Sequence, residues 1–204
     1  YEVCSQINDA EVRKITFTEE LQPDLSALKK QRDEHTKIIF ICSPNNPIGN
    51  TINREAVDAI LSTSHSIVVV DEAYIDFSDN NSLINLIGKY SNLVVLQTLS
   101  KSWAAAGLRL GICIASEAVI NILSKVKLPY NISSQAQSIA LKLLADKQAF
   151  DNKIITIKQE RIRLFNALSG LGTFEKVYPS EANFILVKAN KAKELYQFLL
   201  ANNI

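Results

Sequence analysis

The residues best suited to chemistry stand where apolar runs end. Asp71 closes the run IVVVD, and Tyr74 follows three positions later. Lys101 lies just after the run LVVLQT, in the stretch TLSKSW, and Arg109 comes eight positions later. A lysine amine can act as a nucleophile or carry a proton, while an acid, a phenol and an arginine can bind and orient a polar ligand. The types and spacing therefore indicate a ligand site.

Each of these residues also has a purely structural explanation. Asp71 could cap the turn after a strand, Tyr74 could be an aromatic at the edge of the core, and Lys101 could be a surface lysine. The other candidates have similar alternatives: a carboxylate partner for Arg109, a helix cap for Thr98 and Ser100, and turn chemistry alone for Asn45, Asn46, Pro47 and Gly49. Only their joint order at successive strand ends favours a site.

The elements that must position these residues follow an alternating pattern. Short, nearly continuous apolar runs typical of strands covered on both faces span 37–42, 66–74, 92–98 and 108–115. Helical patterns span 23–33, 53–64, 82–90 and 117–126. This rhythm predicts an α/β fold with a mostly parallel sheet sandwiched by helices. Ligands bind such sheets outside the carboxyl ends of the strands, where the candidates lie.

The pattern changes after about residue 128. A helix capped by Ser133 is predicted for 133–146, and one long amphipathic helix for 146–170, ending at Gly170. We expect three parts: a large cofactor-binding domain (1–145, incomplete at its start), an interdomain helix (146–170) and the start of a small, truncated α+β domain (171–204). The first residues resemble mid-domain sequence, so we expect an excerpt of a longer protein.

Composition narrows the class of protein. Of the 204 residues, 47% are hydrophobic and 21% are charged, with a net charge of +1. There is no clustered basic excess for nucleic acid and no apolar run long enough to span a membrane. Three scattered cysteines have no metal-ligand spacing and suit a reducing cytoplasm. We therefore expect a cytoplasmic protein that binds a small molecule and no metal.

The candidate set matches what a pyridoxal phosphate site requires. A lysine bonds to the cofactor's aldehyde, and an ionised acid faces the pyridine nitrogen. An amide and a phenol can contact the ring's 3-oxygen, and hydroxyls with an arginine can bind the phosphate. Lys101 would bond to the aldehyde and Asp71 would face the ring nitrogen. An asparagine of the turn at 43–49 and Tyr74 would contact the 3-oxygen. The phosphate would be bound by Thr98, Ser100 and Arg109.

Four motifs stand out together: SPNNPIG (43–49), VVVDEAY (68–74), TLSKSWAAAGLRLG (98–111) and KLPYN (127–131). This set resembles one enzyme superfamily, the fold-type I pyridoxal phosphate-dependent aminotransferases, and within it the histidinol-phosphate aminotransferase family. The resemblance covers nearly the whole chain. It implies that Lys101 carries the cofactor, with Asn46, Asp71, Tyr74, Thr98, Ser100 and Arg109 as cofactor contacts. It also implies that Tyr130, Asn131 and Asn183 lie on the substrate side, and that the protein is a homodimer.

The resemblance implies a transaminase that moves an amino group between glutamate and imidazole-acetol phosphate, giving histidinol phosphate in histidine biosynthesis. One departure is Ile48, where the family usually has Thr. The family's upstream phosphate loop, ring-stacking aromatic and downstream arginine are not within these residues, so we expect an incomplete substrate site. Alternatives are another enzyme of the superfamily, such as an aromatic aminotransferase or a phosphothreonine decarboxylase, or a transcription regulator that uses the same fold.

Overall fold

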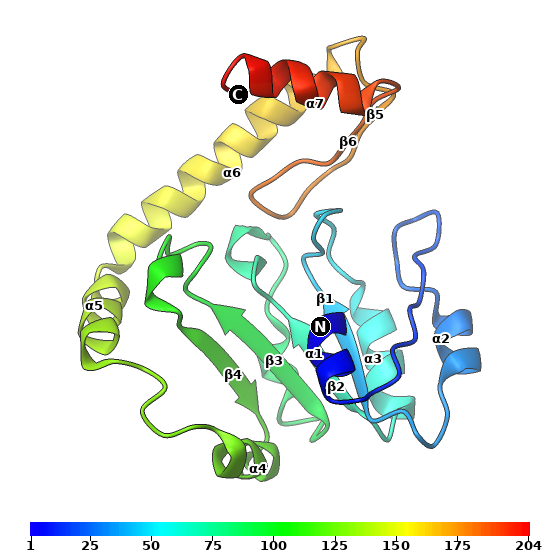
Figure 1. Cartoon of the computed structure of the whole chain (residues 1–204), viewed down its shortest axis with the longest axis vertical. Coiled ribbons are helices and arrows are strands. Elements are labelled where there is room, and N and C mark those ends of the chain that lie inside the picture. Colours follow the sequence, from blue (N-terminus) through cyan, green and yellow to red (C-terminus); the bar gives the residue numbers. More distant parts are fainter.

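The computed structural model describes residues 1–204 and contains a four-stranded sheet in the order β1-β2-β3-β4 (Figure 1). The strands are β1 (Ile38–Cys42), β2 (Ile67–Asp71), β3 (Leu93–Thr98) and β4 (Gly111–Ala115). β1 pairs with β2 and β2 with β3 in parallel, whereas β4 is antiparallel to β3. The predicted α/β class, with a mostly parallel sheet flanked by helices, is confirmed.

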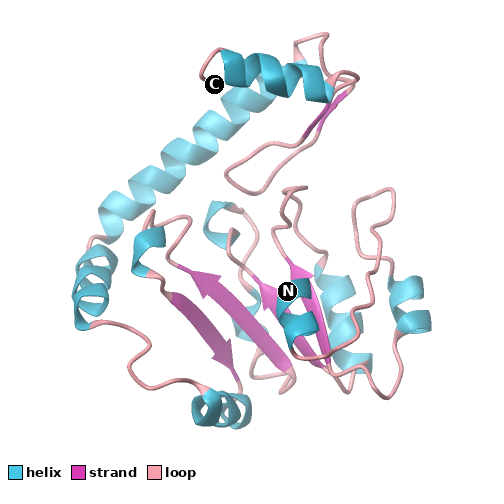
Figure 2. Ribbon diagram, in the orientation of Figure 1, coloured by secondary structure: helices cyan, strands magenta, loops and turns pink.

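Helices connect and flank these strands (Figure 2). The α-helices are α1 (Glu2–Ile7), α2 (Leu25–Gln31), α3 (Arg54–Thr63), α4 (Glu117–Val126), α5 (Ser134–Ala145), α6 (Lys147–Ser169) and α7 (Ala192–Ala201). Three short 3-10 helices are η1 (Ile75–Phe77), η2 (Leu83–Leu86) and η3 (Ala106–Leu108). A second, two-stranded antiparallel sheet joins β5 (Lys176–Val177) to β6 (Val187–Lys188). None of the helices has both the length and the apolar character needed to cross a membrane.

The main core lies between the first three strands, α3 and η2. Its fully buried members include Val57 of α3 and Val68, Val70, Leu93 and Val95 of the sheet. Each such side chain stabilises the fold by roughly 1.5–3 kcal/mol relative to an exposed position. In β1, where only one face is buried, this packing also fixes the register, because a slip of one residue would turn Ile39 and Ile41 toward solvent. The core therefore holds the strand ends in fixed relative positions.

Two details differ from the sequence expectations. The pattern over 82–90 predicts a helix, but only the 3-10 turn of η2 forms, started by Ser82, whose hydroxyl accepts from the Ile84 N–H at 3.2 Å. The apolar runs also predict strands covered on both faces, which holds for the middle of β2 and the first half of β3. In β1 burial alternates, with Ile38 and Phe40 exposed, and most of β4 is exposed.

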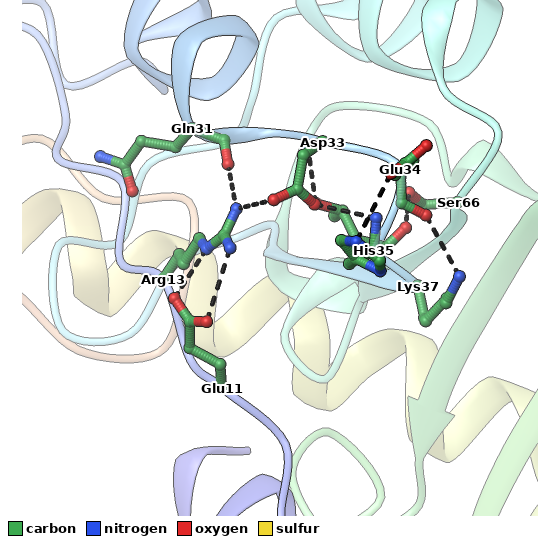
Figure 3. A network of polar contacts seen from close by, with 9 residues as sticks. Glu11, Arg13, Gln31, Asp33, Glu34, His35, Lys37 and Ser66 are labelled. Carbon is green, nitrogen blue, oxygen red and sulfur yellow. Dashed lines mark hydrogen bonds and ion pairs between the residues drawn. The ribbon is translucent and has the colours of Figure 1, made fainter.

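A polar network fastens the extended segment after α1 to the loop before β1 (Figure 3). The Arg13 guanidinium donates to the Asp33 carboxylate at 2.6 Å, to the Gln31 carbonyl at 2.6 Å and to Glu11 at 2.8 Å. In the same loop, the Lys37 amine donates to the Glu34 carbonyl at 3.1 Å. The charge of Arg13 is thus paired within this network, which lies at the amino end of β1.

The long helix α6 runs from α5 to the part of the molecule that holds β5, β6 and α7 (Figure 1). Near its start it packs on the segment after β2: Ile154 lies in a buried cluster with Tyr74, Phe77 and Ala182. The Arg161 guanidinium donates to the carbonyls of Phe77 at 2.8 Å and Ala182 at 3.0 Å. The helix therefore joins the C-terminal segment to one edge of the main sheet.

Candidate active site

The candidate residues gather at one edge of the main sheet because of its topology. The parallel strands β1, β2 and β3 all end there, and the antiparallel β4 begins there. Across the sheet, Asp71 pairs with Cys42 on one side and Leu96 on the other, and Thr98 pairs with Gly111. The residues that follow the first three strands and precede the fourth therefore lie around one edge, as the rule for open α/β sheets predicts.

Asn46, Tyr74 and Lys101 are brought into one cluster. The Asn46 amide donates to the Tyr74 hydroxyl at 2.9 Å, although 28 residues separate them. The Lys101 amine lies 5.4 Å from the centroid of the Tyr74 ring. Tyr74 is buried, and the Phe184 ring meets it edge-on at 5.1 Å. An exposed lysine amine with no hydrogen bond or ion pair, beside a fixed phenol, is available to a ligand.

Asp71 has two hydrogen-bond donors on its carboxylate. One oxygen accepts from the Ala73 N–H at 2.9 Å, so the residue does cap the turn after β2. The other accepts from the Tyr1 hydroxyl. Burial, followed by the contact with Asp71, raises the pKa of Tyr1. Tyr1 also stacks on Phe40 at 4.2 Å. Tyr1 could not be predicted as a partner of Asp71, because nothing in its local pattern points to a residue 70 positions away.

Thr98 and Ser100 form a small hydroxyl pair at the end of β3. Their side-chain oxygens lie 2.9 Å apart, and the Ser100 N–H donates to the Thr98 oxygen at 3.1 Å. The Thr98 oxygen also lies 3.2 Å from the Leu110 carbonyl. Arg109 precedes Leu110 in the chain, so its backbone lies beside this hydroxyl pair. Its backbone is left-handed (φ 54°), and its guanidinium donates only to the Ala106 carbonyl, at 3.0 Å. The alternative of a structural carboxylate partner for Arg109 is not observed.

The loop that carries Lys101 is fastened to the segment that carries Tyr74. The buried hydroxyl of Ser102 donates to the Asp76 carboxylate of η1. Beside Lys101, the Trp103 ring stacks on Phe150 of α6 with centroids 3.9 Å apart. Sequence reasoning did not include Ser102 and Asp76 in the site. Their spacing from Lys101 and Tyr74, one and two residues, is the only signal that could have pointed to them.

The turn after β1 meets the C-terminal segment at Gly49. Its φ of +88° lies in the region that glycine favours, and a Cβ there would stand 2.4 Å from the Ser180 hydroxyl oxygen. The Glu181 N–H donates to the Gly49 carbonyl at 2.6 Å. The Glu181 carboxylate in turn accepts from the Ser78 hydroxyl at 2.8 Å and the Asp79 N–H at 2.9 Å. Glu181, which the sequence analysis did not select, thus joins two loops at the candidate site.

The three residues expected on the substrate side are not part of the cluster. Tyr130 is 98% exposed, and Asn131 accepts from Lys127 within its own loop at 3.1 Å. This loop runs between α4 and α5, on the β4 side of the sheet and away from β1 (Figure 1). Asn183 is exposed, and its neighbour Phe184 contacts Tyr74. Only Asn183 therefore approaches the cluster through its chain neighbours.

The donor set fits pyridoxal phosphate. A free amine, a carboxylate and a phenol–amide pair lie at one sheet edge with two hydroxyls and an arginine that has no carboxylate partner. These are the groups that an aldehyde, a ring nitrogen, a ring oxygen and a phosphate would engage. Lys101 is the only nucleophilic amine in the cluster with the Tyr74 phenol. The arrangement can therefore hold a phosphorylated, electron-withdrawing cofactor next to a proton-carrying lysine.

Comparison with known proteins gives a consistent result. The family model for class I and II aminotransferases matches residues 1–204. The chain is 46% identical to a histidinol-phosphate aminotransferase of Flavobacterium johnsoniae over 204 residues, which cover all of this chain and 58% of that protein. A solved histidinol-phosphate aminotransferase from Clostridium acetobutylicum superposes with a TM-score of 0.92 at 26% identity, covering 100% of this chain and 63% of that one.

A second solved structure contains a ligand. It is a histidinol-phosphate aminotransferase from Sinorhizobium meliloti in complex with pyridoxal-5'-phosphate, with a TM-score of 0.84 at 22% identity. The match covers 98% of this chain and 56% of that one. At this identity the match supports the fold alone. The chain spans less than two thirds of the length of each of these three proteins.

Proposed function

Because this chain belongs to the class I and II aminotransferase family, we propose that its protein exchanges an amino group between glutamate and imidazole-acetol phosphate or histidinol phosphate. The cofactor would be pyridoxal phosphate, and the pathway histidine biosynthesis. The observation that carries the proposal is the Lys101 amine, without a carboxylate partner, beside a Tyr74 ring whose hydroxyl accepts from Asn46. The similarity to histidinol-phosphate aminotransferases supports the choice of substrate.

The chain's own residues would hold the cofactor by complementary chemistry. When bound, pyridoxal phosphate supplies an aldehyde that can bond to an amine and a ring that withdraws electrons from the substrate's α-carbon. The carboxylate of Asp71 would hold a proton on the ring nitrogen. Asn46 and Tyr74 would contact the ring's 3-oxygen. The phosphate would take hydrogen bonds from the hydroxyls of Thr98 and Ser100 and from the Arg109 guanidinium.

Lys101 would also move the proton that the reaction requires. Its amine is the only basic side chain in the cluster, so it is the group to take a proton from the α-carbon of the amino donor and to return one later. Tyr74 would limit the directions from which the amine can approach, since its buried ring forms one wall beside the amine. The Asn46 contact would keep the phenol from rotating away.

Several finer assignments complete the proposal. Tyr130, Asn131 and Asn183 would lie on the substrate side, and residues 1–145, 146–170 and 171–204 would form the large domain, the interdomain helix and part of the small domain. Tyr130 is almost wholly exposed, so a contact with substrate would need a further surface to enclose it. Family membership supports a cytoplasmic homodimer, and light scattering of the purified protein would test the dimer.

Replacing Lys101 by Ala tests the central assignment. We expect loss of the covalent bond to the cofactor, seen as loss of its visible absorbance band, and a fall in turnover of about a thousandfold or more. Lys89→Ala is a matched control, because Lys89 also lies over a tyrosine ring, at 4.7 Å from Tyr90, but outside the site. Normal turnover by Lys101→Ala protein would exclude the assignment.

Substrate assays separate the proposed reaction from related ones. With glutamate as donor, we expect faster turnover of imidazole-acetol phosphate than of aromatic keto acids. A preference for aromatic keto acids would indicate an aromatic aminotransferase. Release of CO2 from phosphothreonine would indicate a decarboxylase. Cofactor binding without turnover of any of these, together with DNA binding, would indicate a transcription regulator.

A further inference from the structure

A buried carboxyl group lies directly behind the candidate site and has no role in the proposed chemistry. Glu72 follows β2, and its side chain is 2% exposed. Its oxygens accept from the Ser82 hydroxyl at 2.5 Å, the Leu83 N–H at 2.7 Å and the Gln97 amide at 3.0 Å. Burying a carboxyl group is costly unless hydrogen bonds replace its water. Three donors from η2, its cap and β3 converge on the Glu72 carboxylate and replace its water.

Glu72 and Asp71 serve different sides of the same strand end. Side chains of successive residues in an extended strand point to opposite faces. Accordingly, the two carboxylates share no partner: that of Asp71 binds Ala73 and Tyr1, whereas that of Glu72 binds η2 and β3. Between the strands, the Glu72 N–H donates to the Leu96 carbonyl at 2.8 Å. Glu72 thus belongs to the strand end but faces away from the site.

The end of β3 has the same arrangement. Thr98 contacts Ser100 and the Leu110 carbonyl on the side of the site, while its neighbour Gln97 contacts Glu72 and Ser82. Two strand ends therefore each contribute one residue to the site and one behind it. The rear residues, Glu72 and Gln97, are hydrogen-bonded to each other across the strands. This bond is a side-chain link between the ends of β2 and β3.

We propose that Glu72 is a positioning residue whose cross-strand bond to Gln97 fixes the separation between the Asp71 carboxylate and the loop that carries Thr98 and Lys101. The inference rests on the proposed function, because those two groups are the ones that would hold opposite ends of the cofactor ring. Neither Glu72 nor Gln97 touches the cofactor or the substrate. A misplacement of about 1 Å between reacting groups can cost roughly a hundredfold in rate.

The experiment removes this bond while leaving the other partners of Glu72 in place. Gln97→Met keeps the length of the side chain but deletes its donor. In the cofactor-loaded protein we expect a kcat about tenfold lower, little change in KM for glutamate, and a shifted pH midpoint of the visible absorbance band. Ser82→Ala is the matched control, since Ser82 also donates to Glu72 but caps η2 and is not part of β3. It should lower the melting temperature while leaving the midpoint unchanged.

A reciprocal exchange provides a rescue. In Glu72→Gln/Gln97→Glu, a carboxylate and an amide again face each other between the strands, so kcat and the midpoint should return toward the wild-type values. Equal behaviour of Gln97→Met and Ser82→Ala, in kcat and in the midpoint, would overturn the inference and leave Glu72 a structural residue. Failure of the exchange to recover either quantity would count against it as well. A normal absorbance band in Lys101→Ala would instead reject the proposed function itself.

Discussion

The two edges of the main sheet, at the amino and carboxyl ends of its parallel strands, use charged residues in opposite ways. At the amino end, Arg13 bonds to Asp33, Glu11 and the Gln31 carbonyl, and these contacts satisfy its guanidinium (Figure 3). At the carboxyl edge, Lys101 and Arg109 have no carboxylate partner at all. The contrast is the same in the acids: Asp33 binds a cation, whereas Asp71 binds an N–H and a phenol.

The comparison distinguishes charged residues that hold two segments together from charged residues that are free to bind a ligand. A paired surface charge contributes little to stability, typically about 0–1 kcal/mol, and leaves nothing for a ligand. An unpaired cation held near a sheet edge by buried neighbours contributes nothing to the fold, but it can engage an incoming phosphate or aldehyde. We therefore expect changes at the amino end to alter stability alone. Changes at the carboxyl edge should alter activity, except where the backbone itself is strained.

The largest expected effect on stability is at Gly49, where the turn after β1 meets the C-terminal segment at the carboxyl edge of the sheet. Gly49→Ala would force a Cβ against the Ser180 hydroxyl in a left-handed backbone. Backbone strain of about 1–2 kcal/mol and overpacking of about 1–3 kcal/mol should together lower the free energy of unfolding. Urea denaturation measures the loss.

A second variant separates the two causes. Ser180→Gly removes the side chain that the new Cβ would meet, so Gly49→Ala/Ser180→Gly should recover the overpacking part and retain the backbone strain. Ser180→Gly alone provides the reference, because it also removes the oxygen that accepts from the Ala182 N–H at 3.0 Å. If the double variant loses as much free energy of unfolding as the two single variants together, the new Cβ does not clash with Ser180, which would argue against contact between these segments.

A smaller effect is expected at Tyr74, and it should fall on activity. Tyr74→Phe keeps the buried ring beside Lys101 but removes the hydroxyl that accepts from Asn46. Losing one hydrogen bond at a reacting group should lower kcat by roughly tenfold to a hundredfold. Stability should change by about 1 kcal/mol. Steady-state kinetics and thermal melting of the same preparation measure both. Unchanged kcat with a large loss of stability would mean that Tyr74 serves the fold and not the activity.

The sequence allowed the prediction of much of the sheet and of the cluster at its edge. Continuous apolar runs predict buried strands, because such segments must be shielded from water on both faces. The carboxyl ends of parallel strands lie at one edge of the sheet. Asn46, Tyr74 and Lys101 could therefore be grouped from their order alone, and their contacts are present. The roles of these residues toward a cofactor stay a prediction.

Other features depend on contacts that no local pattern encodes. The run over 82–90 has helical spacing, yet the Ser82 hydroxyl and the Leu83 N–H turn toward Glu72, which leaves only a 3-10 turn. The direction of β4 could not be predicted either, because an apolar run is the same for parallel and antiparallel pairing. Tyr130 and Asn131 were grouped with the site by motif, and the chain's folding leaves their loop on the β4 side.

The smallest expected effect is at the amino end of β1 and depends on pH. The hydrogen bond from Arg13, the largest cause, lowers the pKa of Asp33 from 3.8 to about 2 in the folded protein. A group whose pKa is lower when folded stabilises the fold above its unfolded pKa, and this contribution disappears as pH falls through the folded value. Asp33→Asn should therefore be less stable than the wild type above about pH 4. The difference should shrink between pH 3.8 and about 2.

Urea unfolding at a series of pH values measures this difference directly. Glu34→Gln is the control, because Glu34 is the adjacent carboxylate but does not contact Arg13. It should show no comparable loss of stability at neutral pH. Activity of the folded Asp33→Asn protein should equal that of the wild type, since Asp33 lies at the far end of β1 from Lys101. A stability difference that persists unchanged down to pH 2 would contradict the role of the Asp33 charge. A fall in kcat would mean that the two edges of the sheet are not as independent as their contacts indicate.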